Sequence, residues 1–170
     1  MPFIRLETMI AAPIELCFDL SRDLDVHMAS SGLTGERAVA GVTSGMVKLG
    51  DTVTWEGTHL GVRQRLTSKI IAYDRPSMFV DEMLRGAFKR WHHTHLFEQR
   101  ADGTLMIDEV DYASPLGPLG RLVDMLYLEN YMRRFLLRRN AHIKMVAETS
   151  NDLTSMRTQS HESSDVVISP

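Results

Sequence analysis

Two histidines that alternate with aromatic residues are the strongest chemical feature of this sequence. A strand over residues 90–97 places every second residue on one face. That face carries four large side chains: Trp91, His93, His95 and Phe97. An Asp102-Gly103 pair follows, which is a strong hairpin-turn signal. We therefore expect residues 106–112 to return as the partner strand of a hairpin.

The partner strand adds a carboxylate to the same neighbourhood. Asp108 shares a face with Val110 and Tyr112. If both faces point inward, polar groups lie in an apolar interior, where each needs a hydrogen bond. His93 and His95 could then tie the strands together through Asp108 or Asp81, or the same groups could orient a bound ligand. A histidine tuned by a neighbouring aspartate could also act as a general acid or base.

The inward-facing set follows from placing Phe97 and Val110 inside. We predict that it binds a ligand, and it comprises Trp55, His59, Asp81, Trp91, His93, His95, Asp108 and Tyr112. The candidates for catalysis within it are His93, His95 and Asp108. A metal site formed by His59, His93 and His95 is the least favoured hypothesis, because the spacing matches no known metal motif. We therefore expect no metal ion and no cofactor.

The first half of the chain must position these residues. Residues 3–11 predict a strand, Pro13 begins a short helix, and a second short helix is expected over 22–29. From residue 37 onward, alternating segments separated by turns predict six or seven short strands of one antiparallel sheet. In the segment 52–61, Glu56 falls on the face that is predicted to meet solvent.

The last part of the chain switches to a helical pattern. A helix is expected from about Leu119 to about Glu148, with a bend near 127–130, where its apolar stripe shifts register. Four arginines in it could form a patch for phosphate or anionic lipid, but a solvated face is the favoured interpretation: Arg133, Arg134, Arg138 and Arg139. Residues 149–170 are rich in Ser, Thr and Asp, so we predict a disordered tail after a single domain over 1–148.

Composition excludes several classes of function. The net charge of −3 provides no field that would recruit nucleic acid or an anionic membrane surface. The single cysteine, Cys17, rules out an internal disulfide and predicts a buried thiol. No apolar run is long enough to cross a membrane, and residues 1–5 lack the pattern of a signal peptide. A cytoplasmic location is the expectation, and a homodimer is left open.

Several short motifs resemble one known superfamily. They are Thr54-Trp55, His59-Leu60-Gly61, Phe79-Val80-Asp81, Gly86-Ala87-Phe88, the segment 91–97, Gly103-Thr104, Asp108-Glu109-Val110 and the segment 115–120. With the order of elements, they resemble the START/Bet v 1-like (SRPBCC) superfamily, and within it the polyketide cyclase/dehydrase-like and CoxG-like bacterial ligand-binding proteins. The resemblance covers about residues 1–147.

The resemblance implies an α+β helix-grip fold. In that fold a curved seven-stranded antiparallel sheet wraps around a long C-terminal helix, two short helices follow the first strand, and a ligand cavity lies between sheet and helix. It also implies a binding or carrier protein for a hydrophobic small molecule (a lipid, a polyketide-like or an aromatic compound), with a cavity of several hundred cubic ångströms. The alternatives are a cyclase or dehydratase that uses a cavity His/Asp pair, and an interaction module with a filled cavity.

Overall fold

The computed structural model describes residues 3–32, 34–113 and 127–164, with side chains as far as residue 155. The described elements, in chain order, are β1 (Phe3–Ile10), α1 (Ile14–Ser21), α2 (Leu24–Ser30), β2 (Arg37–Gly41), β3 (Thr52–His59), β4 (Val62–Asp74), β5 (Met78–Arg85), β6 (Arg90–Arg100), β7 (Gly103–Ala113) and α4 (Glu129–Ser164).

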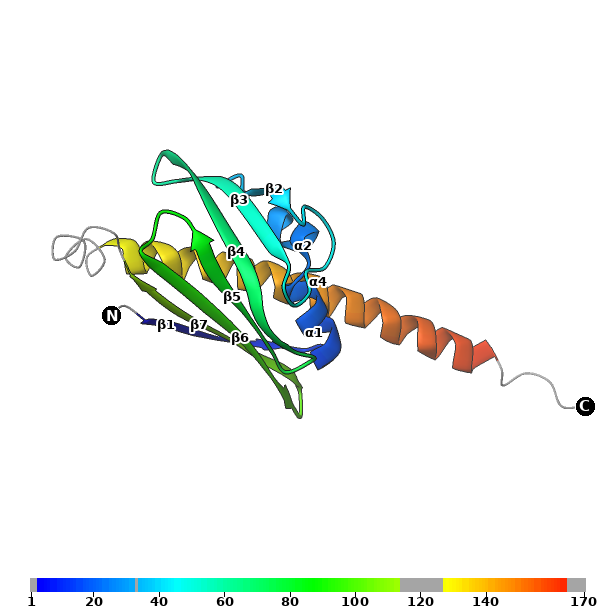
Figure 1. Ribbon diagram of the computed structural model, residues 1–170. Helices are drawn as coiled ribbons and strands as arrows, with labels where there is room; N and C mark the ends of the chain where they lie inside the picture. Colours follow the sequence, from blue (N-terminus) through cyan, green and yellow to red (C-terminus); the bar gives the residue numbers. More distant parts are fainter. Residues whose placement is uncertain (1–2, 33, 114–126, 165–170) are drawn as a thin grey trace, which may run out of the picture.

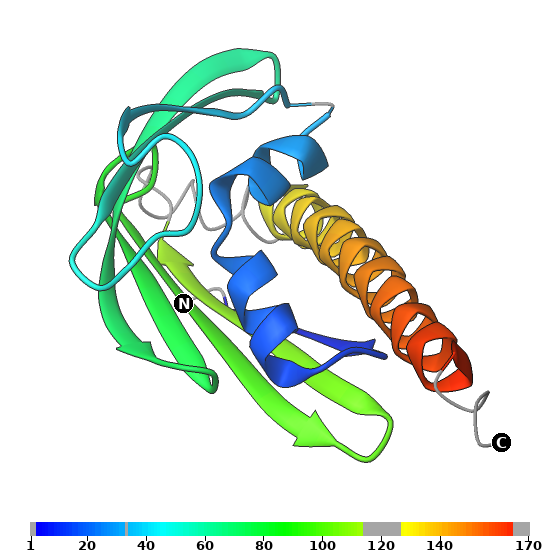
Figure 2. The ribbon, with the colours of Figure 1, turned by 90° about the vertical axis from the view of Figure 1, so that its right-hand side faces the viewer.

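Within the described residues, seven strands form one antiparallel sheet, in the order β1-β7-β6-β5-β4-β3-β2. The sheet curves, and Figure 2 shows α1 and α2 beside α4 on its concave side. Both short helices contact α4. This arrangement confirms the predicted α+β helix-grip architecture.

The alternation in β6 explains why His93 and His95 point inward. Burial changes at every residue from Arg90 to Phe97, so that the buried positions of this segment are 91, 93, 95 and 97. The register pairs His93 with Val110 and His95 with Asp108 on β7. On the other side, β5 places Asp81 opposite His93. Neighbouring strands therefore bring two histidines and two aspartates together on the concave face.

Local signals set the ends of the two short helices. Pro13 is the N-cap of α1 and therefore lies just outside the helix. The Asp23 side chain accepts hydrogen bonds from the backbone N–H groups of Asp25 and Val26. This cap makes α2 begin at Leu24, two residues later than the sequence pattern predicts.

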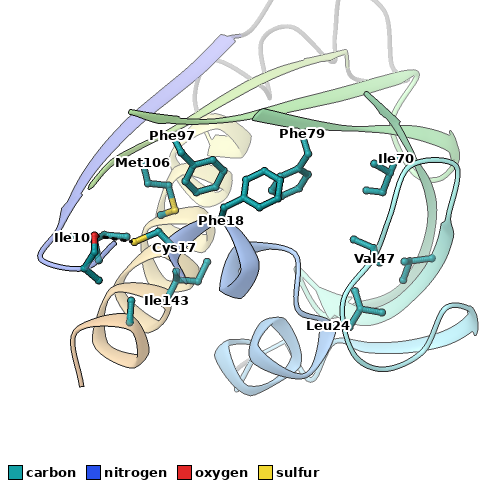
Figure 3. Close-up of a cluster of buried hydrophobic side chains, with 13 residues drawn as sticks. Ile10, Cys17, Phe18, Leu24, Val47, Ile70, Phe79, Phe97, Met106 and Ile143 are labelled. Atoms are coloured by element: carbon teal, nitrogen blue, oxygen red, sulfur yellow. Dashed lines mark hydrogen bonds between the residues drawn. The ribbon is translucent and has the colours of Figure 1, made fainter. Parts of the chain in front are cut away.

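Aromatic rings join α1 to the sheet. Figure 3 shows Phe18 of α1 pointing toward Phe79 and Phe97, whose ring centroids lie 5.6 and 5.4 Å from its own. Cys17 lies in the same cluster as a buried free thiol, as predicted, and burial raises its pKa. Both edge-to-face contacts favour a fixed placement of α1 on the sheet.

The helix α4 differs from the prediction at both ends. Its predicted first part, 119–126, lies outside the described residues, and the described helix begins at Glu129, next to the predicted bend. At the other end, α4 runs through Ser164, so residues 149–164 are helical where we predicted a disordered tail. Ser, Thr, Asn and Asp are poor helix formers, so the composition of this segment does not account for its helix, which continues the preceding turns of α4. Figure 1 shows the last turns extending beyond the sheet.

One carboxylate on the outer face of the sheet is buried. Glu56 is only 5% exposed, although it lies on the face that we predicted to meet solvent. Three arginines cover it and bind its carboxylate: Arg37, Arg63 and Arg65. The period-two pattern gave the correct face, and long arginine side chains explain the burial.

Candidate ligand-binding site

A cavity of about 190 Å³ lies on the concave side of the sheet. Strands β3 to β6, the two short helices and α4 contribute its walls. Most of the lining side chains are apolar or aromatic, among them Leu24, Val53, Ile70, Phe79, Met132 and Leu136. The volume falls below the several hundred cubic ångströms that the resemblance implied.

The carboxylate of Asp108 is the centre of the polar network behind this cavity. Its side chain is fully buried. Oδ1 accepts a hydrogen bond from His93 Nε2 at 2.9 Å, and Oδ2 accepts one from Asn140 Nδ2 at 2.7 Å. Arg139 Nη1 donates to Oδ1 at 3.3 Å. Two strands and one helix therefore meet at one buried charge.

The second carboxylate, Asp81, reaches the same histidines from the cavity side. Its Oδ2 lies 3.2 Å from His95 Nε2 and 3.6 Å from His93 Nδ1. His95 Nδ1 lies 2.9 Å from Asp108 Oδ1, but outside the direction of a good hydrogen bond. Each imidazole thus lies between two carboxylates.

Ring contacts fix the planes of both imidazoles. The ring of His95 stacks on Phe79 with centroids 4.1 Å apart and 15° between planes. The His93 and His95 centroids are 3.8 Å apart. Trp91 meets His93 edge-on. The rings therefore cannot turn freely, and the directions of their nitrogen atoms are set by packing.

Burial and charge shift the pKa values of this cluster. Burial and, second to it, the neighbouring His95 lower the pKa of His93 to about 4, against the opposing effect of Asp108 and Asp81. For Asp108, burial raises the pKa, but the hydrogen bond with His93, the close contact with His95 and the charge of Arg139 outweigh it. Its pKa is therefore held well below the usual range. The pKa of Asp81 is lowered in the same way, chiefly by His95, against burial.

Two residues of α4 complete the network, and our sequence interpretation missed both. Arg139 is buried and donates to Asp108 and to the Ser21 carbonyl, so its prediction as part of a solvated face is wrong. Asn140 is 1% exposed. The signal was present in the spacing, because the buried positions of α4 recur at helical intervals: Met132, Leu136, Arg139, Asn140, Ile143 and Ala147. Arg133, by contrast, does lie at the surface, where it pairs with Glu129 at 3.3 Å.

A second polar cluster lines the same cavity two strands away. Glu36 accepts hydrogen bonds from His27 Nε2 and His59 Nε2, each at 2.9 Å. His59 Nδ1 lies 2.9 Å from the Tyr131 hydroxyl. Burial raises the pKa of Glu36, but both histidine contacts outweigh it and lower the value to about 2. Glu36 and His27 were absent from the predicted set, since neither belongs to a period-two pattern that marks an inner face.

The predicted site residues fall into two groups. Six of them line the cavity: Trp55, His59, Asp81, Trp91, His93 and His95. Asp108 lies behind the two histidines and holds them from the far side. Tyr112 is fully buried and packs on Phe88 and Trp91, away from the cavity lining. His92, between the inward-facing residues of β6, faces outward, since its side chain is 38% exposed beside Glu82.

Among the described residues, no helix combines the length and apolar character that a membrane span needs. No protein-family model and no curated protein sequence matches the chain. Solved structures do match. A protein from Thermus thermophilus is similar over 86% of this chain and 99% of its own chain, with a TM-score of 0.69 and 19% identity.

Two further solved structures share the same arrangement. The major latex-like protein 151 from Panax ginseng matches with a TM-score of 0.63 and 16% identity, over 86% of this chain and 97% of that one. The protein Ara h 8.0201 matches with a TM-score of 0.58 and 13% identity, over 84% and 97%. Together with the sheet order and the long final helix, these likenesses establish that the chain has the Bet v 1-like helix-grip fold.

Proposed function

We propose that the protein binds a small, largely apolar molecule in the cavity between the sheet and α4, as a carrier or sensor inside the cell. The observation that carries this proposal is an apolar cavity with polar clusters at two separate places on its wall. Ligand sites usually combine an apolar lining with a few polar groups that orient the guest. The cavity also argues against the interaction module with a filled interior.

The volume limits the size of the guest. An engineered apolar cavity of about 150 Å³ binds benzene, whereas typical drug-sized sites measure roughly 300–1,000 Å³. A cavity of about 190 Å³ therefore suits a molecule of one or two rings or a short chain better than a sterol or a whole lipid. Hydrogen-bonding groups on the guest would meet Asp81 or the His59–Tyr131 pair.

The test replaces one lining residue by a larger one, so that its side chain fills the cavity. Leu66 is half-buried and lines the cavity, whereas Leu84 is 58% exposed and does not. Indole is the test ligand, and its binding is measured by calorimetry. Native mass spectrometry of the purified protein detects any small molecule that it has retained. We expect saturable indole binding that Leu66→Trp abolishes and Leu84→Trp preserves. Equal binding by both variants, or no binding by the wild type, would contradict the proposal.

A proton-transfer enzyme of the cyclase or dehydratase type is the second candidate, and one observation favours it. Tyr131, His59 and Glu36 form a chain in which a phenol donates to an imidazole that is held by a carboxylate. Burial, followed by the charge of Glu36, raises the pKa of Tyr131, so the phenol keeps its proton. By contrast, a pKa of about 4 makes His93 a weak base at neutral pH.

The enzyme candidate has its own test. Cyclohexanone is small enough for the cavity, and a general base would exchange its α-protons for deuterium in heavy water. If the chain of Tyr131, His59 and Glu36 moves protons, the wild type speeds exchange above buffer and His59→Asn removes most of the gain. His92→Asn, on the outer face, keeps it. Exchange at the buffer rate in the wild type would leave the binding proposal intact and remove this candidate.

A further inference from the structure

Three ligand atoms of the cavity wall converge on one point. Asp81 Oδ2 lies 3.2 Å from His95 Nε2 and 3.6 Å from His93 Nδ1, and all three atoms lie within 4.8 Å of one another. Zinc binds imidazole nitrogen and carboxylate oxygen at about 2.0–2.2 Å, so the ligand atoms of a tetrahedral site stand roughly 3.3 Å apart. The two measured separations lie on either side of that value.

Both histidines direct a ring nitrogen at Asp81, and Asp108 holds His93 from the far side. An ionised carboxylate only accepts, so His93 Nε2 carries the proton that it donates to Asp108, and Nδ1 of the neutral ring is a lone pair facing Asp81. His95 Nε2 lies within hydrogen-bond distance of Asp81 Oδ2, so a metal ion bound here would replace the proton that this nitrogen donates to the carboxylate. Buried carboxylates that orient metal-binding histidines in this way are a common outer shell of metal sites.

The charges of the cluster also call for a cation. Two carboxylates, Asp81 and Asp108, lie near one guanidinium, which Arg139 directs at Asp108 and the Ser21 carbonyl. Asp81 contacts the two histidines of this cluster and neither an arginine nor a lysine in it.

We propose that Asp81, His93 and His95 form a binding site for a divalent transition metal ion of the zinc class. Two imidazoles and one carboxylate suit zinc better than calcium or magnesium. Three protein ligands leave a fourth position for water or for an oxygen atom of a guest, and all three residues line the cavity. The side chain of Asp81 is 18% exposed, so protein atoms do not seal the site. This site revises our expectation that the protein uses no metal.

The test measures zinc alone, so its failure is separable from failure of the ligand-binding proposal. Chelator-treated protein is dialysed against Zn²⁺ and its metal content is measured, and Co²⁺ is then added to follow visible absorption. We expect one zinc per chain for the wild type and tetrahedral cobalt bands. Asp81→Asn keeps the side-chain shape but removes the charged ligand, so it should weaken zinc binding by more than the roughly 10–100-fold that loss of an outer-shell partner causes. His92→Gln, on the same strand as the two histidines but facing outward, should bind as the wild type does.

Two results of the dialysis experiment would overturn the proposal. One is a wild-type protein that retains no zinc above the dialysis buffer. The other is equal loss of zinc in His92→Gln and Asp81→Asn, which would place the metal elsewhere. X-ray absorption of the zinc-loaded wild type should show two imidazole ligands. This measurement tests the site even if the variants do not fold. A spectrum without imidazole scattering would contradict the site.

Discussion

Buried charges in this protein are tolerated because each has several partners drawn from different elements. Asp108 receives donors from β6 and from α4, and Arg139 divides its guanidinium between Asp108 and a carbonyl of α1. Removing a charge from water costs several kcal/mol, which only close and multiple contacts can offset. A network of this kind places its members rigidly, and it makes the loss of any one member costly.

Asp108→Asn should therefore destabilise the protein strongly. Removing one partner of a buried ion pair costs about 3–5 kcal/mol, because the remaining charge stays buried. The matched control is Asp111→Asn on the same strand, where the carboxylate is 33% exposed and pairs with Arg90 at the surface. We expect a change of about 0–1 kcal/mol there. Urea unfolding measures both, and similar losses in the two variants would contradict this role of Asp108.

Glu36 should make the stability of the protein sensitive to acid. Its pKa is about 2 in the folded protein and 4.5 in its ordinary state. The folded state therefore binds fewer protons, so the stabilisation is complete above pH 4.5 and is lost as the pH falls from 4.5 toward 2. The shift corresponds to about 3 kcal/mol at most. Glu36→Gln should flatten this part of the stability profile, whereas Glu98→Gln, on an exposed carboxylate, should leave it unchanged. A Glu36→Gln profile that matches the wild type would contradict the assignment.

At the scale of elements, strands were more predictable than helices. Period-two alternation identified β6 and the inward direction of His93 and His95, because one face of a sheet is either buried or not. The pattern could not reveal which aspartate pairs with which histidine, since that depends on strand register and ring planes. Arg139 was misassigned for a different reason: a charged residue in the buried stripe of a helix looks like surface until its partner Asp108 is known.

The buried face of α4 can be tested with two adjacent leucines. Leu136 is 2% exposed, while Leu137 is 45% exposed. Leu136→Ala should lower the free energy of unfolding by about 2–5 kcal/mol, because a buried side chain leaves a cavity behind. Leu137→Ala should change it by roughly 0.5 kcal/mol or less. Thermal and urea unfolding distinguish the two, and an equal effect would mean that α4 is rotated from the orientation described.

At the scale of the whole molecule, α4 has two roles along its length. Its first turns supply Met132, Leu136 and Arg139 to the cavity wall. Further along, Ile143 and Ala147 join the apolar cluster that includes α1 and the end of β1. One helix therefore couples the site to the packing of the chain's first elements. A change in how α4 packs would alter the cavity wall.

The second role of α4 predicts where the chain can be shortened. Glu148 accepts a hydrogen bond from the Ala11 N–H at 2.9 Å, and Asn151 donates to the Ala11 carbonyl at 3.1 Å. Ending the chain after Asp152 keeps both contacts and should change stability by roughly 0.5 kcal/mol or less.

Ending the chain after Val146 removes both contacts together with Ala147, which is fully buried. Each hydrogen bond contributes about 1 kcal/mol and the buried methyl group adds to this, so we expect a loss of about 2–3 kcal/mol. Urea unfolding of the two shortened proteins makes the comparison. If the chain that ends after Asp152 loses as much, the exposed turns beyond the sheet contribute to folding, and the boundary of the packed domain lies further along α4 than these contacts indicate.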